Sequence, residues 1–173
     1  APDNAPAWVH DREQLWNQVE AAETRINSRV AREVQIALPN ELSPQQQVAL
    51  VRDYVQDVFV AKGMVADVCI HRDNPDNQHA HIMLTTREIS AEGFGQKNRD
   101  WNRKDLLVDW RREWAEHANI ALAKAGYEVV IDHRSHSEVG IGLEPQSKIG
   151  TSRQREDGRV LVAEPEVTIQ GGV

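Results

Sequence analysis

The sequence predicts an α+β domain in which helices pack against an antiparallel sheet. Apolar and polar residues alternate over 29–38, and two short apolar runs, 64–71 and 78–86, are joined by a turn-rich connector. Apolar residues at helical spacing precede, separate and follow these strands. With 173 residues, the chain suits one domain, which we expect over 1–150, and the polar residues 151–173 are expected to form a tail or linker.

The first two predicted elements are a helix and a strand. Apolar residues at helical spacing indicate a helix over 11–24, with Asp11 as its N-cap. The alternation over 29–38 indicates a strand that places Ile36 on its apolar face and Glu33 on the other.

The second predicted helix has the clearest start in the sequence. Ser43 is followed by Pro44 and, three residues after the serine, by Gln46, which is typical of a capping box with proline in the first turn. Gly63 is expected to end this helix. Its buried stripe is predicted to consist of Val48, Val51, Val55, Val58 and Phe59.

The remaining elements are a hairpin, a loop, a long helix and a strand. We expect the hairpin at 64–71 and 78–86, the loop at 87–99, the helix at 101–124 with Asp100 as its cap, and the strand at 127–132.

Charge and composition exclude some functions and leave others open. No run approaches the roughly 20 apolar residues of a transmembrane helix, and Cys69, the single cysteine, cannot form an internal disulfide. The net charge of −7 argues against a nucleic-acid partner, but residues 93–112 hold six lysines and arginines against three aspartates. Such a local basic stretch can bind phosphates on an otherwise acidic chain. Salt screens electrostatic fields beyond a Debye length of about 8–10 Å, so the nearby positive charges have the strongest effect on a bound phosphate.

Three histidines stand at positions that favour a shared metal site. In a strand, His79 and His81 point to the same face, roughly 7 Å apart between their Cα atoms, and His71 ends the partner strand of the hairpin. Three neutral imidazoles can hold a divalent ion and leave coordination positions open for a substrate. The alternative is that these are strand histidines hydrogen-bonded to the backbone, without a metal.

The segment HRDNPDNQHAHIMLTTRE, residues 71–88, resembles the three-histidine motif of the MobA/MobL (MobQ-type) plasmid relaxases, which are HUH endonucleases. Further blocks are similar to that family in the same order. They are LWNQVEAAETR and AREVQIALPNEL upstream, and KNRDWNRKDLLVDWRREWAEHANIALAKAG, IDHRS and LEPQSKIG downstream.

The resemblance implies a palm-like HUH fold and a metal-dependent transesterase that nicks one strand of plasmid DNA at an origin of transfer through a tyrosyl 5′-phosphate intermediate. By motif position the metal ligands are His71, His79 and His81. Mn²⁺ or Mg²⁺ is expected, while Zn²⁺, Ni²⁺ and Co²⁺ are further ions to consider. The implied partners are single-stranded DNA, the relaxosome and type IV secretion coupling proteins. The implied location is the bacterial cytoplasm, with transfer to the recipient along with the DNA, and no membrane partner is expected.

The sequence departs from the family at the nucleophile. The family's tyrosine lies near the native N-terminus, on the first helix after the first strand, whereas this chain has only Tyr54 and Tyr127, which match neither position. We therefore expect the first strand and helix to be missing and the chain alone to bind metal without nicking. Because the family's first strand lies beside the histidine strand, we expect the N-terminal segment of the same relaxase, or a second copy, to fill that gap.

Several further residues are candidates for catalysis or DNA binding, and some of them could instead have only a structural role. Glu33 is a candidate acid/base group, or a residue that orients a histidine, and it could equally be a solvated strand glutamate. Trp101 could stack on a base, or belong to the core of the long helix. The full set of candidate DNA-binding residues is Lys97, Arg99, Trp101, Arg103, Lys104 and Arg134.

Two other functions remain open at this point. One is a three-histidine zinc hydrolase, in which the metal activates water, with a small-molecule pocket and no DNA affinity. The other is a non-catalytic module that binds single-stranded nucleic acid and whose histidines are only structural.

Overall fold

The computed structural model describes residues 1–135 and 138–140. Residues 1–133 form one compact unit, which contains all the elements discussed below. The expected tail, 151–173, and the predicted end of the domain at residue 150 lie outside the described residues.

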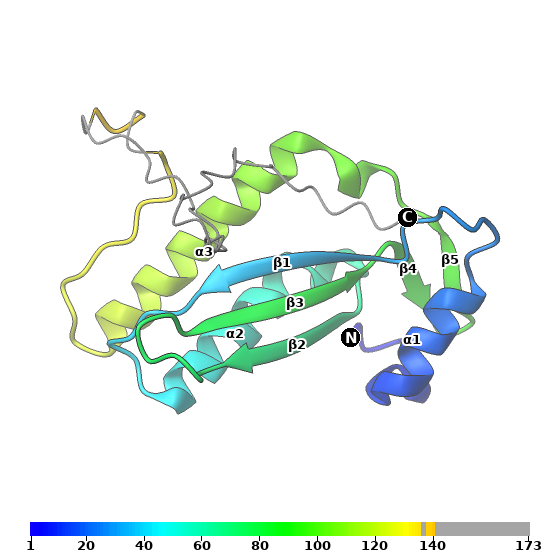
Figure 1. The fold of residues 1–173 in the computed structure, drawn as a ribbon, viewed down its shortest axis with the longest axis horizontal. Helices are drawn as coiled ribbons and strands as arrows, with labels where there is room; N and C mark the ends of the chain where they lie inside the picture. The colour runs from blue at the N-terminus through cyan, green and yellow to red at the C-terminus, as the bar shows by residue number, and fades with distance from the viewer. Residues whose placement is uncertain (136–137, 141–173) are drawn as a thin grey trace, which may run out of the picture. The chain divides into compact units, whose positions relative to one another are not determined.

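The architecture is α+β with antiparallel sheets, as the sequence predicts (Figure 1). The helices and strands are α1 (Arg12–Ala21), β1 (Ala31–Ala37), α2 (Pro44–Val58), β2 (Ala66–His71), β3 (His79–Thr85), β4 (Arg87–Ser90), β5 (Gly93–Lys97) and α3 (Lys104–Lys124). Short 3-10 turns are η1 (Ala7–His10), η2 (Val60–Lys62) and η3 (Asp100–Asn102).

The main sheet has the strand order β1-β3-β2, with β3 antiparallel to both neighbours. In this register Gln35 and Cys69 lie opposite His81 from the two sides, and His71 lies opposite His79. The prediction of an unpaired edge on the strand that carries His79 and His81 is therefore wrong, because β1 and β2 pair with the two edges of β3. The outer edges of this sheet are those of β1 and β2.

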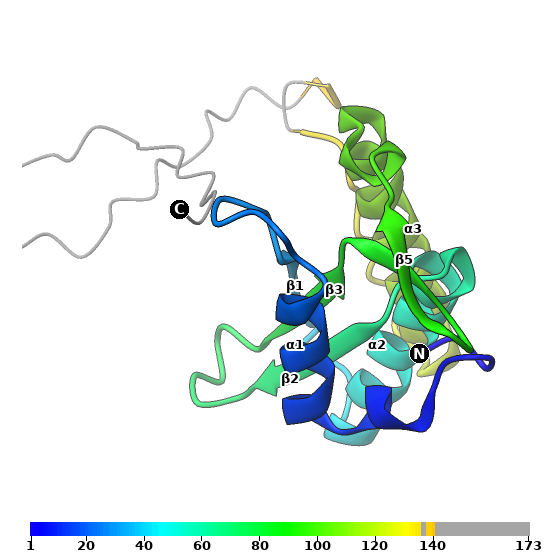
Figure 2. The same cartoon turned by 90° about the vertical axis from the view of Figure 1, so that its right-hand side faces the viewer.

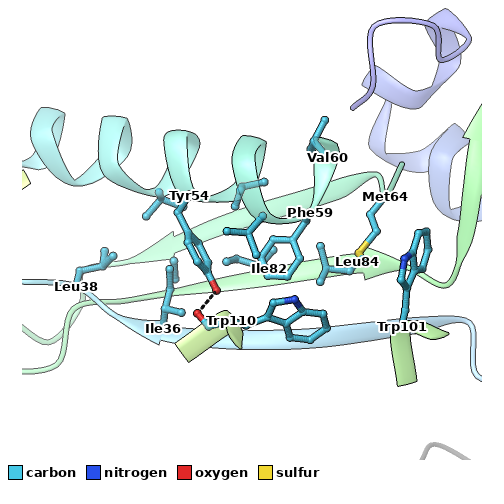
Figure 3. Packing of buried hydrophobic residues seen from close by; sticks show 14 residues of the cluster. Ile36, Leu38, Tyr54, Phe59, Val60, Met64, Ile82, Leu84, Trp101 and Trp110 are labelled. Carbon is cyan, nitrogen blue, oxygen red and sulfur yellow. Dashed lines mark hydrogen bonds between the residues drawn. The ribbon is translucent and has the colours of Figure 1, made fainter. Parts of the chain in front are cut away.

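Helices α2 and α3 cover one face of the sheet, and the main hydrophobic core lies between them and the strands (Figures 1 and 2). Ile82 is fully buried, and Phe59 and Trp110 pack edge to face at 5.1 Å between ring centroids (Figure 3). The Tyr54 hydroxyl donates a hydrogen bond of 3.0 Å to the backbone oxygen of Trp110, which joins α2 to α3. The apolar face of the strand alternation thus faces the helices, and the other face points away from them.

The starts of α1 and α2 agree with the predicted caps. The Asp11 side chain accepts from the backbone N–H of Gln14, and Ser43 and Gln46 form a reciprocal capping box. The predicted stripe of α2 is correct except at its first position: the Val48 side chain is 39% exposed, and Gln47 is buried instead.

The predicted loop over 87–99 is instead a second antiparallel hairpin, β4-β5. Its strands are short and interrupted by a register shift, so the sequence pattern is weak. Ile89 packs against α1 in a cluster with Leu15 and Val19, and Phe94 lies beside this cluster. The hairpin is therefore stabilised by its contacts with a distant helix, which local alternation does not reveal.

Two predictions at the C-terminal end are also wrong. The long helix begins at Lys104, after η3, and Arg103 rather than Asp100 occupies its N-cap. The predicted strand at 127–132 does not form within the described residues. Its backbone at Ile131 instead exchanges two hydrogen bonds with the Asn119 side-chain amide, at 2.7 and 3.0 Å.

Candidate metal centre

The three histidines converge on the sheet face that points away from α2 and α3. His79 and His81 are two residues apart in β3 and so share that face, and His71 joins them from β2. The ring centroids are 5.1 Å apart for His71–His79, 4.7 Å for His71–His81 and 5.0 Å for His79–His81. One ring nitrogen from each lies within 4.8 Å of the others. Within residues 1–135 and 138–140, no other group of this kind could hold a metal ion.

The hydrogen bonds of two rings leave suitable nitrogens for a metal. His79 Nδ1 lies 2.7 Å from the backbone oxygen of Asn77, and His81 Nδ1 contacts Glu33 Oε1. Because a carbonyl and an ionised carboxylate oxygen can only accept, the neutral imidazoles are assigned the tautomer with the proton on Nδ1, which leaves a lone pair on Nε2. A histidine that donates its other N–H to a carbonyl or carboxylate is the usual arrangement around protein-bound metals.

The donor set fits a divalent transition metal. Two imidazole nitrogens bound to one ion at about 2.1 Å each stand about 3 to 3.5 Å apart, so modest side-chain rotations bring these rings onto a common ion. His71 is exposed and His79 and His81 are half-buried, so the site is reachable from solvent. Three ligands on an accessible face leave coordination positions for a phosphate or for water.

Glu33 comes from β1, on the other side of β3 from His71. It lies opposite Met83, diagonal to His81, and a diagonal pair on one face is within reach of long side chains. The Glu33 side chain is 52% exposed and that of His81 28% exposed. The structure therefore brings Glu33 together with one of the three histidines.

Lys97, a predicted DNA contact, is engaged within the protein. Its Nζ donates to Glu23 Oε2 at 3.1 Å and to the backbone oxygen of Arg29 at 2.7 Å. Arg87 donates to the other oxygen of Glu23 at 3.1 Å. Burial raises the pKa of Glu23, but hydrogen bonds from Arg87, Ser28 and Lys97 outweigh it and lower that pKa to about 2.

The other basic candidates of this region lie around η3 and the start of α3. Arg99 and Lys104 are exposed, and neither forms an ion pair within the part of the chain that the structure describes. Arg103 is exposed but pairs with Asp105, whose hydrogen bond raises the pKa of the arginine. Arg134 falls in the second unit of the chain, residues 134–173, and stays a sequence-based prediction.

Trp101 lies in the main core and is 8% exposed, which leaves its ring little surface for a base (Figure 3). Arg32 fixes this turn, because its guanidinium donates to the Trp101 backbone oxygen and to the Asn102 side chain. The same group lies 5.4 Å from the ring centroid of Trp110. The burial favours the core alternative for Trp101 over base stacking.

Neither tyrosine approaches the histidines as a nucleophile would. Tyr54 is 1% exposed and lies on the helix side of the sheet, and burial, with a smaller contribution from Glu113, raises the pKa of its hydroxyl. Tyr127 follows α3, where its backbone N–H donates to the Leu122 oxygen. The expectation that neither is the catalytic tyrosine stays a prediction.

Sequence patterns did not identify one buried polar residue, Gln47 of α2, which hydrogen-bonds to Gln78 and Arg72, the sequence neighbours of His79 and His71. It is 1% exposed, although glutamine is seldom buried. Helical periodicity could have predicted its burial, because position 47 lies on the same helix face as the buried residues Leu50, Val51 and Tyr54.

Comparison with known proteins identifies the family of this chain. The MobA/MobL family profile matches residues 1–159. The chain belongs to this family. Within residues 1–135 and 138–140, none of the helices has the length and apolar character needed to span a membrane.

Individual relatives have names from plasmid transfer. Conjugal transfer protein TraA of Rhizobium radiobacter is 41% identical over 86% of this chain, and mobilization protein MobL of Acidithiobacillus ferridurans is 33% identical over 81%. The chain spans 16% of that TraA and 46% of that MobL. A solved structure described as "Molecular Basis of Vancomycin Resistance Transfer in Staphylococcus aureus" matches with a TM-score of 0.72 and 37% identity, over 78% of this MobA/MobL chain and 72% of the other.

Proposed function

We propose that this chain is the metal-binding part of a conjugative relaxase domain, which nicks one strand of plasmid DNA at an origin of transfer through a tyrosyl 5′-phosphate intermediate. The observation that carries the proposal is the convergence of His71, His79 and His81, with ligand nitrogens within 4.8 Å, on an accessible sheet face. Membership of the MobA/MobL family supports DNA as the substrate rather than the small molecule of a zinc hydrolase.

The chain's own residues would bind and orient. His79 and His81 through Nε2, and His71 through one ring nitrogen, would hold a divalent ion, Mn²⁺ or Mg²⁺ by family resemblance, and this ion would supply Lewis-acid stabilisation of phosphate charge. Glu33 keeps the His81 proton on Nδ1 and fixes the ring, which favours the orienting role over acid/base chemistry. Arg99 and Lys104 supply exposed positive charge for DNA phosphates.

The nucleophile would come from outside this chain, because Tyr54 is enclosed in the core and Tyr127 lies beyond α3. The proposed source is the tyrosine-bearing segment of the same relaxase or a second copy. A strand from such a partner can pair only at the outer edges of β1 or β2 in the main sheet. Relaxosome and coupling proteins of the bacterial cytoplasm complete the proposed set of partners.

A metal titration combined with a cleavage assay tests this function. Mn²⁺ is titrated into the chain, into a His79→Ala, His81→Ala double variant and into a His10→Ala control, since His10 is exposed and remote in sequence. We expect binding in the chain and in the control and its loss in the double variant. A labelled single-stranded oligonucleotide with the plasmid's own origin should be bound but left intact.

Cleavage should appear once the tyrosine-bearing segment is joined to the chain, with the protein attached to the 5′ end. Cleavage by the chain alone would contradict the assignment of the nucleophile. Mn²⁺ binding that survives in the double variant would contradict the three-histidine site.

A further inference from the structure

The connector between β2 and β3, residues 72–78, is attached to the start of α2 by side-chain hydrogen bonds. This attachment matters because the connector is mostly exposed and joins two of the three histidines directly. Arg72 follows His71, and Gln78 precedes His79. Hydrogen bonds to Arg72 and Gln78 therefore restrain the end of β2 and the start of β3.

The side-chain amide of Gln47, in α2, forms the hydrogen bonds that attach the connector. Its Nε2 donates to Gln78 Oε1 at 2.7 Å and to the backbone oxygen of Pro39 at 3.1 Å. Its Oε1 accepts from Arg72 Nε at 3.1 Å. One buried amide thus contacts the residue next to His71 and the residue next to His79 at the same time.

The side chain of Arg72 is also fixed on its other branch, because it donates to the backbone oxygen of Pro44 at 3.2 Å. The backbone of Gln78 is tied as well, since its oxygen accepts from the Leu38 N–H at 2.9 Å. Gln47 is therefore the centre of a network in which both of its amide hydrogens and its oxygen are used. A buried amide whose nitrogen and oxygen both have hydrogen-bond partners favours one local geometry.

The three histidines differ in how much they need this support. His81 lies inside the ladder, with Gln35 and Cys69 paired on its two sides. His71 and His79 form the last pair of the β2-β3 ladder, next to the exposed connector. Ends of secondary structure open at low free-energy cost unless they are held, so the positions of His71 and His79 depend on the connector more than that of His81 does.

We propose that Gln47 is a positioning residue for the metal centre, which fixes His71 and His79 through Arg72 and Gln78. The proposal rests on the three-histidine site of the proposed function. Supporting residues around metal ligands commonly change metal affinity by about 10- to 100-fold when they are lost.

The test compares Gln47→Leu with Gln45→Leu, a matched change at an exposed position of the same helix turn. Mn²⁺ affinity is measured by calorimetry, and folding by circular dichroism and the thermal midpoint. We expect Gln47→Leu to bind Mn²⁺ about 10-fold more weakly and Gln45→Leu to bind it normally. In the metal-free protein, imidazole NMR signals of His71 and His79 should broaden or shift, while those of His81 stay in place.

Arg72→Met provides a second route to the same answer if Gln47→Leu does not fold, because Arg72 is exposed and its loss spares the core. It should weaken Mn²⁺ binding several-fold and change the same two histidine signals. If folded Gln47→Leu and Arg72→Met bind Mn²⁺ normally while His79→Ala abolishes binding, the positioning role of Gln47 is overturned and the metal site stands. Normal binding by His79→Ala would instead overturn the proposed metal site itself.

Discussion

Glu33 and His81 meet across two strands, in a contact that controls one imidazole of the candidate centre. A carboxylate on Nδ1 fixes the tautomer, the ring orientation and the basicity of Nε2. The pair is partly exposed, so its direct contribution to folding is small. Its effect should therefore appear in metal binding rather than in stability.

Replacing Glu33 should weaken the metal site without unfolding the chain. For Glu33→Ala we expect about 10- to 100-fold lower Mn²⁺ affinity, because the ring loses its orienting acceptor. Glu33→Gln keeps an oxygen that can accept from Nδ1 and should lose less affinity. Calorimetric titration measures both, with Glu41→Ala, at an exposed loop position, as the control. Equal affinity in all of these variants would show that Glu33 is an ordinary strand glutamate.

At this scale, strand alternation explains which site residues could be predicted. The period of two places His79 and His81 on one face in any strand, so their convergence follows from the sequence. The contact of Glu33 with His81 depends on the β1-β3 register, which local patterns do not set. The burial of Trp101 likewise depends on the distant Arg32, which holds its turn.

At the scale of elements, Glu23 connects the segment after α1 with the β4-β5 hairpin. Its side chain is 6% exposed and accepts from Arg87 of β4 and Lys97 of β5. The lowered pKa of Glu23, about 2 against an ordinary 4.5, means that the ionised form stabilises the folded chain. This contribution is complete above pH 4.5 and is lost as the pH falls towards 2.

Glu23→Gln should therefore destabilise the chain most at neutral pH. We expect a decrease in the free energy of unfolding on the order of 3 kcal/mol at pH 7, which shrinks as the pH falls below 4.5. Urea unfolding between pH 3 and pH 7 measures it, and Glu20→Gln, at an exposed position of α1, should show no such trend. A difference that stays the same at pH 3 and pH 7 would contradict the ionic role.

The same network explains why the hairpin could not be predicted. Elements with strong local signals, such as the capping box of α2 and the alternation of β1, appear where the sequence places them. The strands of β4 and β5 depend on Glu23 and on packing against α1, both distant in sequence. Residues 127–132 show the converse, because a sequence of high β propensity forms no strand without a partner strand.

At the scale of the whole molecule, charge is distributed unevenly. The chain has a net charge of −7, yet the stretch around η3 and the start of α3 is basic. Much of this charge is used internally, since Lys97 pairs with Glu23, Arg103 with Asp105 and Arg112 with Asp109. In the proposed function, positive charge for a DNA strand comes first from Arg99 and Lys104, which are exposed and form no ion pair within the described residues.

Binding of single-stranded DNA should depend on salt through these two residues. Each phosphate contact contributes a slope of about −0.7 to the plot of log K against log salt concentration. Arg99→Ala and Lys104→Ala should therefore each reduce the steepness by roughly 0.7, and together by roughly twice that. Fluorescence anisotropy with a labelled oligonucleotide between 50 and 200 mM salt, about the range over which such contacts are usually resolved, measures the slope.

Arg52→Ala is the matched control, because Arg52 is exposed on α2 and lies outside η3 and the start of α3. It removes the same charge from the chain, so a general effect of net charge would change its slope as well. If Arg99→Ala and Lys104→Ala leave the slope unchanged, the DNA strand does not follow η3 and the start of α3. If all three variants reduce it equally, the attraction comes from the overall field and not from contacts at this surface.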